Sequence, residues 1–170
     1  MSKAFTRESD DEADDLPPRP SSALPPGAKN FVTPDGAERL RSELHRLADE
    51  ERPQVAAGPD DADRKRQLAR LEQRISQLEE TLRTAIVMPP PESADERREV
   101  RFGASVTVQR ASGEATYRIV GVDEADFDRG WVSYLAPVAR ALLNARLGDR
   151  VRFRFPSGEE DLEIVAIRYE

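Results

Sequence analysis

The sequence predicts an α+β protein in which an antiparallel helical hairpin is followed by a small antiparallel β-sheet domain with one helix. Three observations lead to this class. Apolar residues recur every three or four positions in the first half of the chain, and they alternate with polar residues in the second half. Between the two patterns, the proline-rich run MPPPESADERR interrupts regular structure. We therefore expect a hairpin at 30–87, a linker at 88–98 and a sheet domain at 99–170.

The chain begins with an acidic segment, residues 1–29, that is rich in proline and serine. Residues 8–15 alone hold six acids and no base. A segment with so few large apolar side chains cannot offset the entropy lost on ordering. We therefore predict a disordered tail, which either keeps the protein soluble or docks on a basic partner.

Thr33, Pro34 and Asp35 predict the start of the first helix. Threonine can cap a helix, proline suits the first helical position, and an acid in the first turn faces the positive end of the helix dipole. The helix is expected to run to about residue 55. One face carries apolar residues at spacings of three, four and three: Ala37, Leu40, Leu44 and Leu47.

A second helix is expected after Gly58 and Pro59. Its apolar positions alternate in steps of three and four, which is the spacing of a coiled-coil seam. These positions are Leu68, Leu71, Ile75, Leu78, Leu82 and Ala85. Two helices joined by a short turn can bury their apolar faces only against each other, so the pattern predicts an antiparallel coiled-coil hairpin.

Alternating apolar residues predict four strands in the sheet domain. The residues that mark them are Val106 and Val108; Tyr117, Ile119 and Val120; Val151, Phe153 and Phe155; and Leu162, Ile164, Val165 and Ile167. Gly113 and the Ser157-Gly158 pair indicate hairpin turns. A short helix is expected at 136–145, beginning at Pro137.

Composition excludes several classes of function. The net charge of −7 argues against a simple electrostatic DNA-binding protein. The absence of cysteine excludes thiolate catalysis and cysteine-based metal sites, and His45, the single histidine, is expected on the surface of the first helix. No phosphate-binding loop or catalytic triad is present, so an independent enzyme is not expected. No window is apolar enough for a membrane span or a signal peptide, which predicts a soluble, cytoplasmic protein.

Three acids lie at the expected turn of the hairpin, namely Asp60, Asp61 and Asp63. Exposed carboxylates hold magnesium only weakly unless another ligand, such as a phosphate, completes the site. The acids therefore either complete a metal site supplied by a partner or cap the second helix, and the residues alone favour capping. No metal is expected to bind stably to this chain alone.

Three arginines recur every four residues on one face of the second helix, namely Arg66, Arg70 and Arg74. Such a stripe could lie along a phosphate backbone or along the acidic wall of a protein channel. It could equally pair with acids of the same helix, such as Asp63. The sequence leaves both interpretations open.

The segment from Arg118 to Glu170 closely resembles the C-terminal domain of the bacterial Gre transcript-cleavage factors. The matching elements are VGVDEAD, APVARALL, GDRV and PSGEEDLEI. Upstream, residues 33–55, with their ERPQV element, are similar to the first arm of the coiled coil of the same factors, nearest the GreB branch. Residues 68–86 resemble the returning arm.

The resemblance implies an FKBP-like C-terminal domain that docks at the rim of the secondary channel of bacterial RNA polymerase. The hairpin would enter the channel, where two tip acids help hold the second magnesium ion of the polymerase, whose own site hydrolyses a backtracked transcript. The chain would then be an accessory factor and not an enzyme, with no cofactor beyond that shared Mg²⁺. It would meet nascent RNA and DNA only through the polymerase complex, and it would not contact a membrane. The implied docking residues are Asp123, Pro137, Ala139, Arg140 and Leu142, and the implied basic face of the hairpin is Arg66, Arg70 and Arg74.

The chain departs from the family at the tip of the hairpin. The family segment of the form GDRSENADY is absent, and Val55 is followed directly by AAGPDDADRKRQL. The loss of about a dozen residues shortens each arm by about six residues, or about 9 Å. Magnesium coordination needs oxygens within about 2 Å, so Asp60, Asp61 and Asp63 are expected to stop short of the ion.

We therefore expect a monomeric, Gre-like factor that binds bacterial RNA polymerase and modulates elongation or backtracked complexes. Stimulation of transcript cleavage is doubtful because the acidic tip segment is missing. The alternative is a short-hairpin protein-binding regulator that resembles the regulators of nucleoside diphosphate kinase.

Overall fold

The structure, a computed structural model, describes residues 24–170. Most of the segment predicted as a disordered tail therefore lies outside the described residues. Its last part, residues 24–29, forms a turn in which the Ala28 N–H donates to the Pro25 carbonyl at 2.9 Å. The Tyr134 hydroxyl holds the end of this turn by donating to the Lys29 carbonyl at 2.6 Å. Regular contacts with the rest of the molecule thus begin before residue 30.

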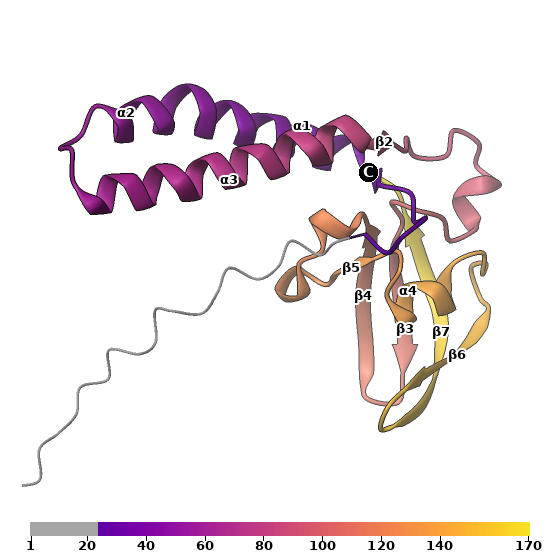
Figure 1. Cartoon of the computed structure of the whole chain (residues 1–170). Helices are drawn as coiled ribbons and strands as arrows, with labels where there is room; N and C mark the ends of the chain where they lie inside the picture. Colours follow the sequence, from indigo (N-terminus) through magenta and orange to yellow (C-terminus); the bar gives the residue numbers. More distant parts are fainter. Residues whose placement is uncertain (1–23) are drawn as a thin grey trace, which may run out of the picture.

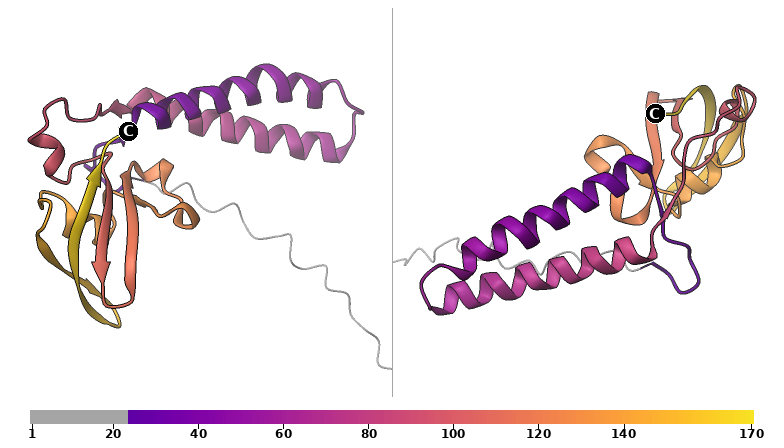
Figure 2. Two further views of the ribbon diagram at one scale, coloured as in Figure 1. Left: turned by 180° about the vertical axis from the view of Figure 1, so that it is seen from behind. Right: turned by 90° about the horizontal axis from the view of Figure 1, so that it is seen from above.

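The first half of the chain forms two helical arms that lie side by side (Figures 1 and 2). The first arm contains α1 (Pro34–His45), η1 (Arg46–Glu51) and α2 (Arg52–Ala56), and the returning arm is α3 (Ala62–Thr84). The start of α1 is as predicted, because the Thr33 side chain accepts a hydrogen bond from the Gly36 N–H at 3.0 Å.

Within the first arm the helix widens into the π-helical turn η1, which the sequence did not predict. We attribute it to Pro53, which has no N–H to donate to the carbonyl four residues earlier and whose ring crowds that carbonyl. In the wider turn the Arg52 N–H bonds to the Leu47 carbonyl, five residues back.

The arms pack through the apolar faces expected from the spacing. The buried residues of this cluster are Val32, Ala37, Leu40, Leu47, Ile75 and Leu78, and Leu44, Leu71, Leu82 and Ala85 are partly buried against it. The cluster is concentrated toward the base of the arms and thins toward the turn that joins them.

A two-stranded parallel sheet closes the base of the arms. It consists of β1 (Phe31–Val32) and β2 (Ile86–Val87), in the register Phe31 to Ile86 and Val32 to Val87. Strands of two residues have no detectable period, which is why the sequence did not predict them. The Asn30 side chain strengthens this junction by donating to the Thr81 carbonyl at 2.9 Å.

The second half of the chain forms a five-stranded sheet in the order β5-β4-β3-β7-β6, which confirms the predicted α+β class. The strands are β3 (Ser105–Arg110), β4 (Gly113–Val120), β5 (Trp131–Ser133), β6 (Arg150–Phe155) and β7 (Gly158–Arg168), accompanied by the helix α4 (Pro137–Leu142). The prediction of a wholly antiparallel sheet is wrong, because β5 pairs with β4 in parallel. This three-residue strand is too short to show an alternating pattern.

A β-bulge explains the run of apolar residues in β7. Thr107 of β3 lies opposite Ala166, whereas the next residue, Val108, lies opposite Ile164. Val165 is therefore skipped in the pairing, and it is exposed although the sequence grouped it with the core strand.

The core of the sheet domain lies between the sheet and α4. Its buried residues are Val100, Ala104, Val106, Val108, Ile119, Ala139, Leu142, Leu162 and Ile164.

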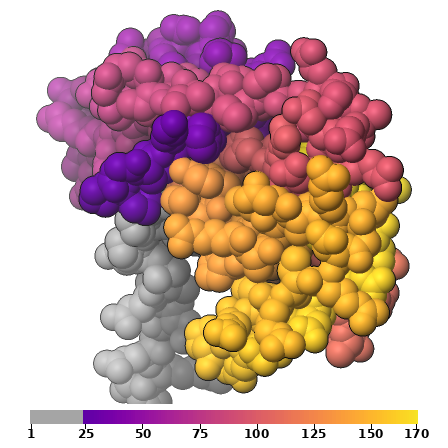
Figure 3. All heavy atoms as spheres, turned by 90° about the vertical axis from the view of Figure 1, so that its right-hand side faces the viewer, coloured from indigo at the N-terminus to yellow at the C-terminus, as the bar shows by residue number. Residues whose placement is uncertain are grey.

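The short 3-10 helix η2 (Glu96–Arg98) lies within the predicted linker. In the space-filling view the segment that starts the described chain lies between the returning arm and the domain (Figure 3). Among residues 24–170, no helix is long and apolar enough to cross a membrane.

Candidate functional site

The turn between the arms holds the three acids that the sequence singled out, and Asp61 caps α3. Its Oδ1 accepts a hydrogen bond from the Arg64 N–H at 2.8 Å, which confirms the capping interpretation for this residue. Asp60 forms ion pairs with the Arg64 guanidinium and, at 3.6 Å, with the Lys65 ammonium. Asp63 pairs with Arg66 at 3.3 Å.

Each tip carboxylate is thus engaged by a cation or by the helix end, and the three do not converge on one point. In the described part of the chain, no group of three or more His, Cys, Asp or Glu side chains could hold a metal ion. Magnesium needs several oxygen ligands at near-octahedral positions. The tip residues therefore do not fit a magnesium site made by this chain alone.

The capping role of Asp61 leads to a first prediction. Asp61→Ala should lower the free energy of unfolding by about 1 kcal/mol, because the Arg64 N–H loses its acceptor at the helix end. The measurement is urea denaturation with and without magnesium, and the loss should be the same in both. Asp63→Ala is the matched control, since its exposed pair with Arg66 contributes little. A loss that appears only with magnesium would contradict the capping role.

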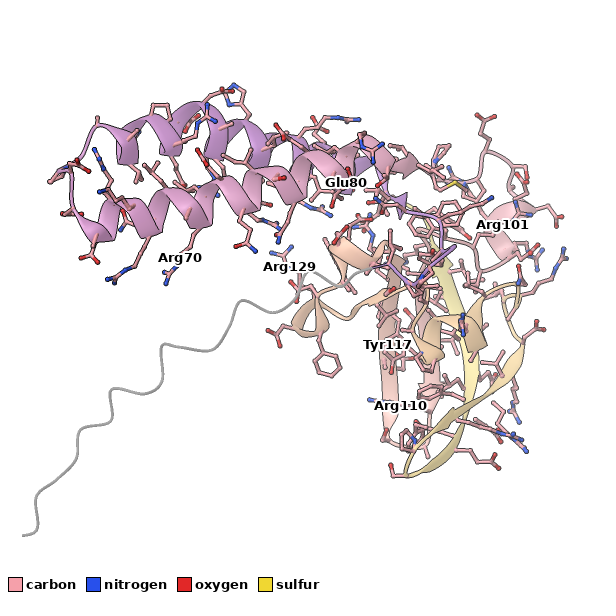
Figure 4. All side chains as sticks on the ribbon, viewed as in Figure 1. Arg70, Glu80, Arg101, Arg110, Tyr117 and Arg129 are labelled. Atoms are coloured by element: carbon pink, nitrogen blue, oxygen red, sulfur yellow. The ribbon has the colours of Figure 1, made fainter. Side chains whose placement is uncertain are left out.

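The predicted arginine stripe is divided by its contacts. Arg74 makes two bonds to the Glu43 carboxylate of the first arm, at 2.9 and 3.1 Å, and Arg66 pairs with Asp63. Arg70 is exposed and points away from the arms (Figure 4), and among the described residues it has no ion-pair partner. Pairing with acids of the same helix is therefore confirmed for Arg66 alone, because Arg74 pairs with an acid of the first arm.

The base of the arms is joined to the sheet domain by a buried carboxylate that sequence reasoning missed. Glu124 ends the 3-10 helix η3 (Val122–Glu124), and its side chain is 2% exposed. Its Oε2 accepts from the Thr33 N–H at 2.9 Å and from the Gly121 N–H at 3.0 Å. Its Oε1 accepts from the Thr33 hydroxyl and, at 3.5 Å, from Arg39. The carboxylate therefore links the cap of α1 to the loop after β4.

Close approach at this junction requires glycine at residue 36. A Cβ atom added to Gly36 would lie 1.8 Å from the Glu124 Oε1. The sequence did contain a signal for Glu124, because this residue lies in the VGVDEAD element that resembles the family. The resemblance, however, directed attention to the neighbouring residue, Asp123.

Asp123 lies in the same 3-10 turn but remains exposed. The Thr81 hydroxyl of the returning arm donates to its Oδ2 at 3.4 Å. Burial of part of the carboxyl group by the neighbouring arm raises the pKa of Asp123 above its ordinary value. The carboxylate lines a groove of about 930 Å³ between the returning arm, η3 and residues 24–30.

The other implied docking residues fall into two sets. Pro137 and Arg140 are exposed on α4, so they can contact a partner. Ala139 and Leu142 are fully buried in the core of the sheet domain, so they hold α4 in place and cannot contact a partner directly. The four residues of this sequence element are therefore suited to two different roles, contact with a partner and support of the helix.

A second junction missed by sequence reasoning surrounds Trp131. The guanidinium carbons of Arg39, Arg118 and Arg129 lie 4.8, 5.0 and 5.2 Å from the centroid of the ring. Arg118 also pairs with Asp35 at the start of α1, at 3.3 Å. Cation–π contacts of this kind, together with the ion pair, couple the first arm to β4 and β5.

Comparison with known proteins identifies the family. Residues 94–169 match the family described as Transcription elongation factor, GreA/GreB, C-term. Transcription elongation factor GreB of Neisseria meningitidis serogroup A is 37% identical over 155 residues, covering 83% of this chain and 94% of the relative. Transcription elongation factor GreA of Alkalilimnicola ehrlichii is 40% identical over 153 residues, covering 81% and 96%.

Among solved structures, a prokaryotic GreA/GreB transcription elongation factor from Nitrosomonas europaea is 26% identical, with a TM-score of 0.40, and covers 83% of this chain and all of that chain. The family assignment rests on the sequence relatives, which match along most of their own length. The chain therefore belongs to the GreA/GreB family of transcription elongation factors.

Proposed function

We propose that this chain binds bacterial RNA polymerase at the secondary channel and modulates elongation or backtracked complexes without stimulating transcript cleavage. Family membership is the observation that supports the polymerase as partner, because the two relatives reported above are named transcription elongation factors and each match spans most of each chain. A factor that acts on elongation must contact the transcribing enzyme, which makes the polymerase the partner.

In this proposal the sheet domain is an FKBP-like docking domain and the arms form the coiled coil that enters the channel. The arms project from one side of the domain (Figure 1), and the 23 residues of α3 give a length of about 35 Å. The exposed members of the implied docking set, Asp123, Pro137 and Arg140, would contact the rim. Arg70, which has no ion-pair partner among the described residues, would face the channel wall.

The proposed lack of cleavage stimulation is supported by the tip. The carboxylates there are opposed by Arg64, Lys65 and Arg66. This reduces the negative charge available to a second metal ion in the polymerase. In addition, the comparison with the Neisseria GreB covers 155 positions but only 83% of this chain, about 141 residues. This difference is consistent with an arm pair shortened by about a dozen residues.

The test uses a stalled, backtracked polymerase complex. The chain should bind core polymerase and should not shorten the transcript, and it should slow cleavage stimulated by a full-length GreB through competition for one site. The triple variant of Asp60, Asp61 and Asp63 to alanine is the control, and it should compete as well as the wild type. Rapid transcript shortening that this variant abolishes would overturn the proposal.

Capture from a bacterial lysate separates this proposal from the alternative partner. Retention of core polymerase on the immobilised chain is expected. Retention of a nucleoside diphosphate kinase without polymerase would instead favour the short-hairpin regulator.

A further inference from the structure

The loop between η3 and β5 displays an unusually exposed aromatic ring. Phe127 is 93% exposed, whereas the other exposed large apolar residues of the described chain are between 36% and 44% exposed. Phenylalanine is among the residue types most often buried. An aromatic side chain held fully in water gives up the favourable free energy of burial, so this ring calls for a physical explanation.

The backbone that carries the ring is held firmly. Phe127 begins the 3-10 turn η4 (Phe127–Arg129), and the Asp126 side chain accepts from the N–H groups of Asp128 and Arg129 at 3.1 and 3.4 Å. The backbones of Asp126 and Trp131 exchange two hydrogen bonds, at 3.0 and 2.8 Å. The ring is therefore displayed by a closed and hydrogen-bonded loop.

Two further features hold this loop close to the sheet. Arg129 pairs with Asp126 at 3.4 Å, and its guanidinium lies over the Trp131 ring. Gly130 has a φ of 71°, and a Cβ there would lie 2.7 Å from the Thr116 carbonyl oxygen. A side chain presented from a fixed backbone loses little entropy on binding, which favours its use in recognition.

The position of Phe127 places it beside the proposed docking surface. It follows the exposed Asp123 by four residues, in the loop that joins β4 to β5. Contact made by Asp123 with a protein surface would bring the same loop against that surface. Aromatic residues are enriched in such interfaces.

We propose that Phe127 is an anchor residue that inserts into an apolar pocket of RNA polymerase when the sheet domain docks. This inference rests on the proposed function and extends the docking surface by one residue. A second copy of the chain is a poor occupant, because one ring buries far less than the roughly 1,200–2,000 Å² of a stable interface. On the polymerase, the arms and the surface around Asp123, Pro137 and Arg140 supply the remaining area.

The test compares the binding of full-length variants to bacterial core polymerase. Phe127→Ala should raise the Kd about 10- to 100-fold, because the variant lacks the aromatic ring whose transfer from water into the polymerase pocket stabilises the complex. Phe127→Leu should retain part of the affinity. Leu147→Ala, at an exposed apolar position outside the docking surface, is the matched control and should bind as the wild type does.

Three results would overturn the inference, and each points to a different cause. Equal binding by wild type and Phe127→Ala removes the anchor role while leaving the proposed function intact. Failure of the wild type to bind polymerase at all overturns the proposed function first. A thermal midpoint lowered by Phe127→Ala would show that the ring stabilises the fold of the chain itself, and the anchor role would then be abandoned.

Discussion

Replacing Glu124 with alanine is expected to lower the free energy of unfolding by about 3–5 kcal/mol. The substitution leaves three buried donors without their acceptor, namely the N–H and hydroxyl of Thr33 and the N–H of Gly121. Each unsatisfied buried group is unfavourable by about 1–3 kcal/mol, and water entering the space recovers part of that loss. Urea denaturation gives the total effect. Amide hydrogen exchange at Thr33 and Gly121 should accelerate as the arms separate from the domain.

Glu124→Gln is the matched control for this prediction. The glutamine oxygen can still accept from the N–H groups of Thr33 and Gly121, so most of the stability should remain. If Glu124→Ala denatures at the urea concentration of the wild type, the carboxylate does not connect the arms to the domain. Loss of stability equally large in both variants would mean that the charge, and not the acceptor geometry, is what matters.

The Glu124 junction also bears on function, because it fixes the direction in which the arms leave the domain. Its glycine neighbour, Gly36, allows the close approach, and Arg118 with Asp35 adds a second connection nearby. If the arms enter a narrow channel, as proposed above, a fixed angle between the arms and the sheet domain would favour their entry. We expect variants that loosen the junction to weaken competition with a full-length GreB more than they weaken docking of the domain.

The parts of the fold that could be predicted from sequence are those determined by neighbouring residues. The cap at Thr33, the proline at the start of α4 and the turn at Gly113 each depend on chemistry within a few positions. The same holds for Asp61, whose capping role was favoured before its geometry was known. Strands of six or more residues were also detectable, because they are long enough for alternation to be visible.

The parts that could not be predicted depend on residues distant in sequence. Glu124 and Thr33 are 91 positions apart, so no local pattern links them. Trp131 meets Arg39 only because the sheet brings β5 against the first arm. The bulge at Val165 has the same origin, since the pairing partner in β3 decides which residues of β7 turn inward.

The docking prediction illustrates a further limit. The resemblance assigned one role, docking, to all the named residues of α4. A helix has a buried side and an exposed side, however, and only residues three or four positions apart share a side. Ala139 and Leu142 stand in this relation, and both face the core. Pro137 and Arg140 lie on the exposed side. Separating the two sets requires knowing where the sheet lies, which the motif alone does not reveal.

Leu142→Ala is expected to lower the free energy of unfolding by about 2–5 kcal/mol. The leucine is fully buried in the core cluster of the sheet domain, and alanine would leave a cavity beside residues such as Ile119 and Leu162. The range reflects how far the surrounding side chains can move into that space. Thermal and urea denaturation monitored by circular dichroism measure the change.

Arg140→Ala is the matched control on the same helix, and the two variants should separate stability from binding. An exposed arginine contributes within about 0.5 kcal/mol to folding, so Arg140→Ala should denature like the wild type while binding polymerase more weakly. Leu142→Ala should lose stability but, at temperatures where it remains folded, should keep most of its affinity. The reverse pattern, with Leu142→Ala fully stable and defective only in binding, would mean that α4 turns its leucine outward when it docks. The division of the docking element into supporting and contacting residues would then have to be abandoned.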